Sequence, residues 1–91
     1  METTIVICAD LADFQNWLYI NIGLVHRSPA RRVVTNNRRY IAVSQVEHMC
    51  GYRCNAVFVT ELGNERENIE QLMRSAEYCL ARPKKPFKFG R

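Results

Sequence analysis

The feature that most constrains the fold is an unbroken β-branched and apolar run near the start of the chain, TTIVICA over residues Thr3–Ala9. A run without polar alternation is typical of a strand that is covered on both faces of a sheet. Asp10 then follows as a helix cap, and Gly23 marks the helix end. The residues between them carry apolar side chains at helical spacing, at Leu11, Phe14, Trp17, Leu18 and Ile22. The chain therefore opens with a strand followed by a helix.

A β-hairpin is the simplest interpretation of residues 31–44. The segments RRVVT and RRYIAVS are both strand-like, and they flank Asn36 and Asn37. Asparagine tolerates the positive φ angles that tight hairpin turns require. Few apolar residues precede the turn, so a single bent strand or a longer loop is the competing interpretation.

The following segment predicts a short helix and a further strand. Ser44 and Glu47 match the capping box, in which two side chains satisfy backbone N–H groups at a helix start, and Gly51 is available to end the helix. The apolar run Asn55–Glu61 then predicts a second strand of core quality.

A long helix is predicted after that strand. Asn64 and Glu67 match another capping box, and Pro83 stops the helix. One face of this helix is apolar, at Ile69, Leu72, Met73, Ala76 and Leu80.

The order β-α-β-β-α-β-α predicts a small Rossmann-like, three-layer α/β domain with a mostly parallel sheet and one hairpin. We expect a single domain over residues 1–82, followed by a basic, extended tail over residues 83–91. Three helices on so few strands leave one sheet face partly open, and an open face is a natural surface for a homodimer.

Localisation and metal binding are constrained mainly by what the sequence lacks. No apolar run approaches the about 20 residues that span a bilayer, and no basic segment precedes the first apolar run, so we expect a cytoplasmic protein without a membrane partner. The four cysteines are then expected to stay reduced. His48, Cys50 and Cys54 fit no common zinc spacing. We therefore expect buried thiols, and neither a metal nor a cofactor.

Part of the chain resembles helicase and terminase motors. The segment NAVFVTEL is similar to their Walker B strand, and IAVSQVEHMCGYRC before it resembles the strand, short helix and G-[YFL]-[RK]-x-[DN] motif that lead into that strand. Thr60 stands where the family has its magnesium-binding aspartate, and no G-x-x-x-x-G-K-[ST] loop is present to hold phosphates. The resemblance implies a small bacteriophage accessory protein with a degenerate motor-like core and without ATP hydrolysis.

Polar residues at the predicted strand ends are the alternative site. Ligands of open parallel sheets bind beyond the carboxyl ends of the strands, where Asp10, Ser44, Thr60, Glu61 and Asn64 are expected. They could hold a magnesium ion or a phosphate ester in a small enzyme or a nucleotide-binding domain. Their simpler role is helix capping, which we favour. His26 or His48 with Cys50 or Cys54 could form a nucleophilic pair, but no catalytic residue is predicted.

The basic residues favour a binding function. The net charge of +4 is concentrated in two clusters that contain aromatic residues. Cations follow phosphates while aromatic rings stack on bases, but the same mixture also marks protein contact patches. We therefore expect a non-catalytic protein that engages nucleic acid, or a host or viral protein; a merely solvated basic face stays the competing interpretation. The candidate binding residues are Arg31, Arg32, Arg38, Arg39, Tyr40, Tyr52, Arg53, Lys84, Lys85 and Lys88.

Overall fold

The fold is built on one four-stranded sheet in the order β2-β3-β1-β4. The computed structural model describes residues 2–49 and 52–80 of the chain. The central strand β1 pairs in parallel with β3 on one side and with β4 on the other, and β2 pairs antiparallel to β3. The predicted mixed, mostly parallel sheet is confirmed. The strands are β1 (Glu2–Ile7), β2 (Arg32–Thr35), β3 (Arg38–Val43) and β4 (Ala56–Val59).

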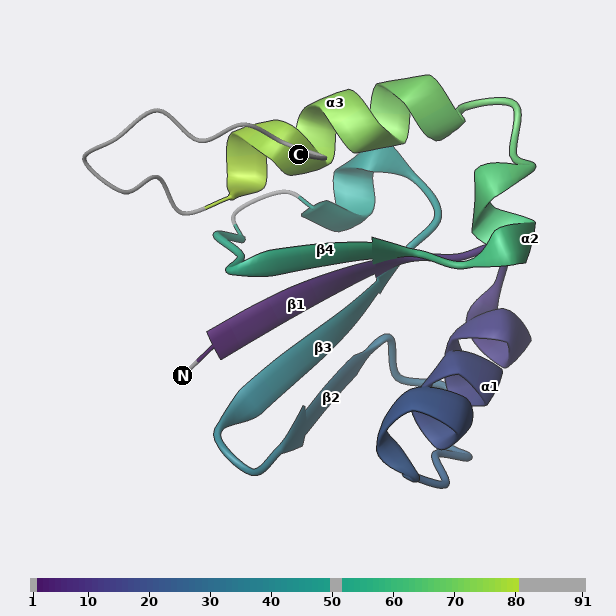
Figure 1. The fold of residues 1–91 in the computed structure, drawn as a ribbon, viewed down its shortest axis with the longest axis vertical. Helices are drawn as coiled ribbons and strands as arrows, with labels where there is room; N and C mark the ends of the chain where they lie inside the picture. The colour runs from purple at the N-terminus through teal and green to yellow at the C-terminus, as the bar shows by residue number, and fades with distance from the viewer. Residues whose placement is uncertain (1, 50–51, 81–91) are drawn as a thin grey trace.

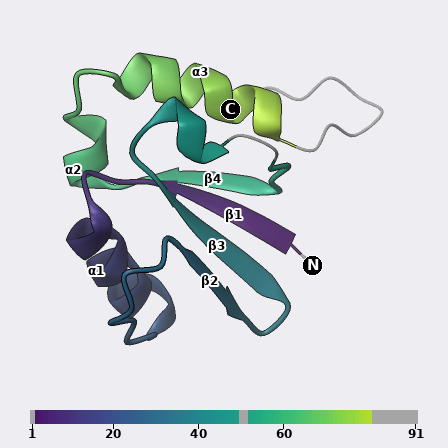
Figure 2. The ribbon, with the colours of Figure 1, turned by 180° about the vertical axis from the view of Figure 1, so that it is seen from behind.

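Helices cover both faces of the sheet (Figures 1 and 2). α1 lies on one face, and the 3-10 helix η1 and α3 lie on the other. The described chain therefore forms three layers, as a helix-covered sheet requires. A short helix that the sequence did not predict, α2, stands between β4 and α3. The helices are α1 (Leu11–Ile22), η1 (Val46–Met49), α2 (Glu61–Asn64) and α3 (Ile69–Cys79).

The opening strand and helix agree with the sequence prediction. The carboxylate of Asp10 accepts the backbone N–H of Asp13 at 2.8 Å and caps α1. Gly23 ends the helix with a φ of 68°, a conformation that glycine adopts without a Cβ penalty. Phe14 and Leu18 are fully buried on the face of α1 that meets the sheet.

The β-hairpin is also confirmed, in preference to a bent strand. Thr35 pairs with Arg38, so the loop contains only Asn36 and Asn37. Both asparagines have positive φ angles, 47° and 64°, which are the values that a two-residue turn of the primed type demands.

The two capping boxes are wrong. At η1 the imidazole of His48 takes the place of the Ser44 and Glu47 side chains: its Nδ1 accepts the N–H groups of Ser44 and Gln45, at 3.1 and 3.3 Å. The long helix begins later than predicted, after Asn68, and Asn64 is instead the last residue of α2. Gly51, the predicted end of the short helix, lies outside the described residues.

β4 is an edge strand, although its sequence predicted core quality. Its inner neighbour is β1, and the side chain of Phe58 is 50% exposed. The strand is also shorter than predicted, because Thr60 caps α2 by accepting the N–H of Gly63 and Glu61 already belongs to that helix.

The core consists of two clusters separated by the sheet. Ile5 and Ile7 of β1 pack into the cluster beneath η1 and α3, while Val6 and Cys8 pack into the cluster beneath α1. This alternation explains why β1 carries no polar face. Within residues 2–49 and 52–80, no helix combines the length and the apolar character needed to cross a membrane.

Candidate functional site

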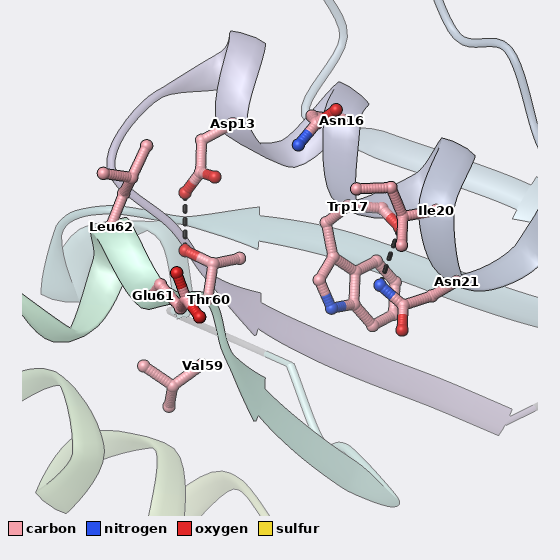
Figure 3. Close-up of a pocket in the computed structure, with 9 residues that line it drawn as sticks. All are labelled: Asp13, Asn16, Trp17, Ile20, Asn21, Val59, Thr60, Glu61 and Leu62. Atoms are coloured by element: carbon pink, nitrogen blue, oxygen red, sulfur yellow. Dashed lines mark hydrogen bonds between the residues drawn. The ribbon is translucent and has the colours of Figure 1, made fainter.

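The region at the carboxyl ends of β1 and β4, called here the strand-tip region, contains residues 9–13 and 60–68. Asp13 is its central polar group. Its carboxylate accepts the backbone N–H of Ala9 at 2.9 Å and the hydroxyl of Thr60 (Figure 3). Asp10 accepts the N–H of Asp13. These oxygens therefore hold the strand ends and α1 together.

α2 and the segment after it close over the end of β1. A Cβ atom placed on Gly63 would lie 2.5 Å from the carbonyl oxygen of Ile7, so the two backbones are in direct contact. Arg66 donates to the carbonyl of Ala9 at 2.6 Å and to the side chain of Asn68 at 3.1 Å. The crevice that holds ligands in open α/β sheets is occupied here by the chain itself. Sequence reasoning missed Arg66, and its sequence context carries no signal for this role.

The other predicted strand-end residues do not complete a cradle. The carbonyl of Ser44 accepts from Asn68 at 3.4 Å, while its N–H is bonded to His48. Glu61 is exposed on the first turn of α2, and Asn64 is exposed at its end.

The candidate nucleophiles are poorly suited to nucleophilic chemistry. Burial raises the pKa of the Cys54 thiol to about 11, so the thiol is protonated at neutral pH. The pKa of His48 is lowered, first by burial and then by the charge of Arg31, in agreement with its role as a hydrogen-bond acceptor. In the described part of the chain, no three His, Cys, Asp or Glu side chains are grouped so as to hold a metal. Cys50 lies outside that part.

The structure brings three of the predicted binding residues together. Arg31, Arg32 and Tyr52 line a hollow of about 200 Å³ beside the edge strand β2, which His48 and Glu47 also line. The two arginines are exposed and Tyr52 is half-buried. Because side chains alternate along a strand, Arg39 faces the same side of the sheet as Ile41, which forms part of the hollow's floor.

The remaining predicted binding residues are separated from this hollow. Arg38 lines a different hollow on the α1 side of the sheet, and its guanidinium lies 3.8 Å from the carboxylate of Glu2. Tyr40 is only 5% exposed and packs against Trp17 with ring centroids 5.9 Å apart, so its ring offers no surface for stacking. Arg53 is exposed next to Tyr52. Lys84, Lys85 and Lys88 lie outside the described residues.

A third hollow lies between α1 and the end of β4 (Figure 3). It has a volume of about 520 Å³, and its apolar lining includes Trp17, Ile20 and Leu62. Ile20 and Leu62 are 69% and 54% exposed, and the exposed ring of Phe58 packs against Trp17 at 5.5 Å. We call this hollow the α1–β4 groove. It is lined by Asp13, Asn16, Trp17, Ile20, Asn21, Val59, Thr60, Glu61 and Leu62.

No family model, curated protein or solved structure matches this chain. The function is therefore argued from the arrangement of the chain's own side chains.

Proposed function

We propose that this protein is a non-catalytic binding protein that holds nucleic acid at the edge of the sheet formed by β2. The observation that carries the proposal is the convergence of Arg31, Arg32 and Tyr52 on one hollow beside this open edge. Arginine side chains bind phosphate oxygens in a forked geometry, and a neighbouring tyrosine offers a ring for a base. We call Arg31, Arg32, Arg39, Tyr52 and Arg53 the basic edge.

The distribution of charge supports a polyanionic partner. Residues 27–53 contain six arginines and one acidic residue, Glu47. Residues 61–77 contain five glutamates and two arginines. The two halves of the molecule therefore carry opposite local charge, and a polyanion approaching it is steered toward the basic edge.

The hydrogen bonds of the strand-tip region weigh against the alternative of a small enzyme or a nucleotide-binding domain. Asp13 and Thr60 are bonded to each other, and Gly63 lies against the backbone of β1. A ligand there would have to displace contacts that hold the fold. The Rossmann-like lineage, the cytoplasmic location and a bacteriophage origin, with a host or viral protein as partner, belong to the same proposal and rest on the sequence pattern alone.

Fluorescence anisotropy with labelled single-stranded and double-stranded oligonucleotides tests this proposal. We expect binding that weakens steeply with salt, because each phosphate contact releases a counterion. The double variant Arg31→Ala/Arg32→Ala should lower the affinity and flatten the salt dependence by about 0.7 per lost contact on a single strand. Arg74→Ala is the matched control, since Arg74 is an exposed arginine on α3.

Two outcomes would contradict nucleic-acid binding. One is an equal loss of affinity in the Arg74→Ala control, which would indicate a general charge effect. The other is an absence of binding to any oligonucleotide at low salt. In that case, capture of a partner from nuclease-treated lysate that depends on Arg31 and Arg32 would assign the basic edge to an acidic protein surface instead.

A further inference from the structure

We propose that the C-terminal segment of this chain, residues 81–91, docks in an extended form along the free edge of β4 and places its phenylalanines in the α1–β4 groove. This inference does not depend on the proposed function, because it concerns the opposite edge of the sheet. It assigns an occupant to the exposed apolar surface formed by Trp17, Phe58 and Leu62.

The end of α3 directs the chain toward this edge. Leu80 forms a parallel bridge with Cys54, and the N–H of Cys54 donates to the carbonyl of Cys79 at 2.8 Å. The next residue, Asn55, donates its N–H inward to Thr3 of β1 at 2.7 Å. Backbone groups on successive strand residues point to opposite sides. Leu80 therefore lies on the outer side of β4 and runs in the same direction as that strand.

The length of the segment matches the length of the edge. From Cys54 to Thr60 the strand advances six residues, about 20 Å at roughly 3.3 Å per residue. Residues 81–86 span the same distance when extended. Phe87 would then reach the level of Glu61, where the groove is lined by Trp17, Ile20 and Leu62.

The chemistry of the segment complements that of the groove. Its end reads Phe87, Lys88, Phe89, an alternation of aromatic and basic residues. The groove offers an apolar floor and the exposed carboxylate of Glu61. The segment carries five cations in eleven residues, while its neighbours in the chain, residues 61–77, are predominantly acidic. Apolar contact and charge attraction therefore favour the same placement.

The prolines define the form of the docked segment. Pro83 and Pro86 occupy positions of opposite parity, so at least one of them would face β4 without an N–H to donate. A continuous hydrogen-bonded ladder is therefore excluded. An extended, polyproline-like path along an edge strand is compatible with both prolines.

The single tryptophan of the chain, Trp17, reports on the groove. We expect the double variant Phe87→Ala/Phe89→Ala, in the full-length protein, to shift the emission of Trp17 to the red and to increase its quenching by acrylamide. The melting temperature should fall by about 4–8 °C if the docked rings contribute about 1 kcal/mol to folding. Lys84→Ala/Lys85→Ala is the matched control, which removes two side chains of the same segment but keeps both rings.

A double-mutant cycle separates direct contact from a general effect of the segment. Ile20→Ala alters the groove at an exposed position that leaves the core intact. Its effect on melting temperature should be smaller in the Phe87→Ala/Phe89→Ala background than in the native chain, because the contact is already lost. Additive effects, or an unchanged Trp17 signal in the phenylalanine variant, would overturn the proposal. A Trp17 signal that depends on protein concentration would assign the groove to the segment of a second copy and would overturn docking within one chain.

Discussion

The strand-tip region and the basic edge differ in what their polar side chains bind. At the strand tips, the oxygens of Asp13 and Thr60 bind each other and nearby backbone groups. At the basic edge, Arg31 and Arg32 are exposed around a hollow next to an open strand. Both regions contain residue types that are common in functional sites.

The difference shows that polar residues at the conventional ligand position of an α/β sheet can be structural. Ligands bind at strand ends because the loops there leave a crevice. In this protein α2 fills that position, with Gly63 against Ile7 and Arg66 on the carbonyl of Ala9. The exposed cations on the side of the sheet are therefore the better candidates for function. Variants in the two regions should separate stability from binding.

The largest expected effect is that of Gly63→Ala in the strand-tip region. The new Cβ would lie 2.5 Å from the carbonyl oxygen of Ile7, so α2 has to move away from β1. We expect a loss of about 3 kcal/mol in the free energy of unfolding, the upper part of the range for overpacking. Urea denaturation followed by circular dichroism measures this loss.

Gly23→Ala is the control for Gly63→Ala. Its Cβ would meet no atom within 4 Å, but its φ of 68° is unfavourable for alanine. The expected cost is about 1–2 kcal/mol, from backbone strain alone. Equal losses in the two variants would show that close packing of α2 on β1 is not what restricts position 63.

Removal of the Asp13 carboxylate should have the next largest effect. Asp13→Ala leaves the N–H of Ala9 and the hydroxyl of Thr60 without their acceptor. Unsatisfied, partly buried donors cost about 1–3 kcal/mol, so we expect a loss of about 2 kcal/mol. Asp10→Ala, which removes the helix cap at an exposed position, should cost about 1 kcal/mol. A strand-tip region built for a ligand would give the opposite result, since removal of a carboxylate would then leave stability unchanged or raise it.

Patterns of local sequence predicted the fold better than the site. The apolar run of β1, the stop at Gly23 and the Asn36–Asn37 turn depend on local backbone preferences, and all three agree with the structure. The capping boxes failed because capping depends on which acceptor is nearest in space. At η1 that acceptor is the imidazole of His48.

The candidate binding residues were separated by facts that no local pattern contains. Tyr40 is buried against Trp17, and Arg38 faces the other side of the sheet from the hollow at Arg31. Side-chain alternation could have separated Arg38 from Arg39, because neighbours in a strand face opposite sides. The position of α2 over β1 depends on the packing of Gly63, which the sequence alone does not specify.

A pH-dependent effect should come from His48, which joins the two regions. Its Nδ1 accepts two N–H groups at the start of η1, and its pKa is lowered from the usual 6.5 by burial and then by the charge of Arg31. As the pH falls below 6.5, the unfolded chain takes up a proton before the folded chain does. The free energy of unfolding should therefore decrease from that pH down to the pKa of the folded state.

His48→Gln, which cannot titrate, is the comparison for this effect. The difference in free energy of unfolding between native protein and variant should narrow between about pH 7.5 and about pH 5.5, the range in which histidine changes charge. Denaturation at both pH values measures it. A constant difference would mean that protonation of His48 does not affect folding.

The smallest expected effect on stability is that of Arg31→Ala/Arg32→Ala at the basic edge. Both side chains are exposed, and exposed substitutions usually change the free energy of unfolding by at most about 0.5 kcal/mol. Loss of Arg31 also removes a charge that lowers the pKa of His48, so any change should slightly favour the folded state at low pH. A loss of 2 kcal/mol or more would place these arginines with Asp13 among the residues that hold the fold. It would also remove the contrast between the two regions on which the binding function rests.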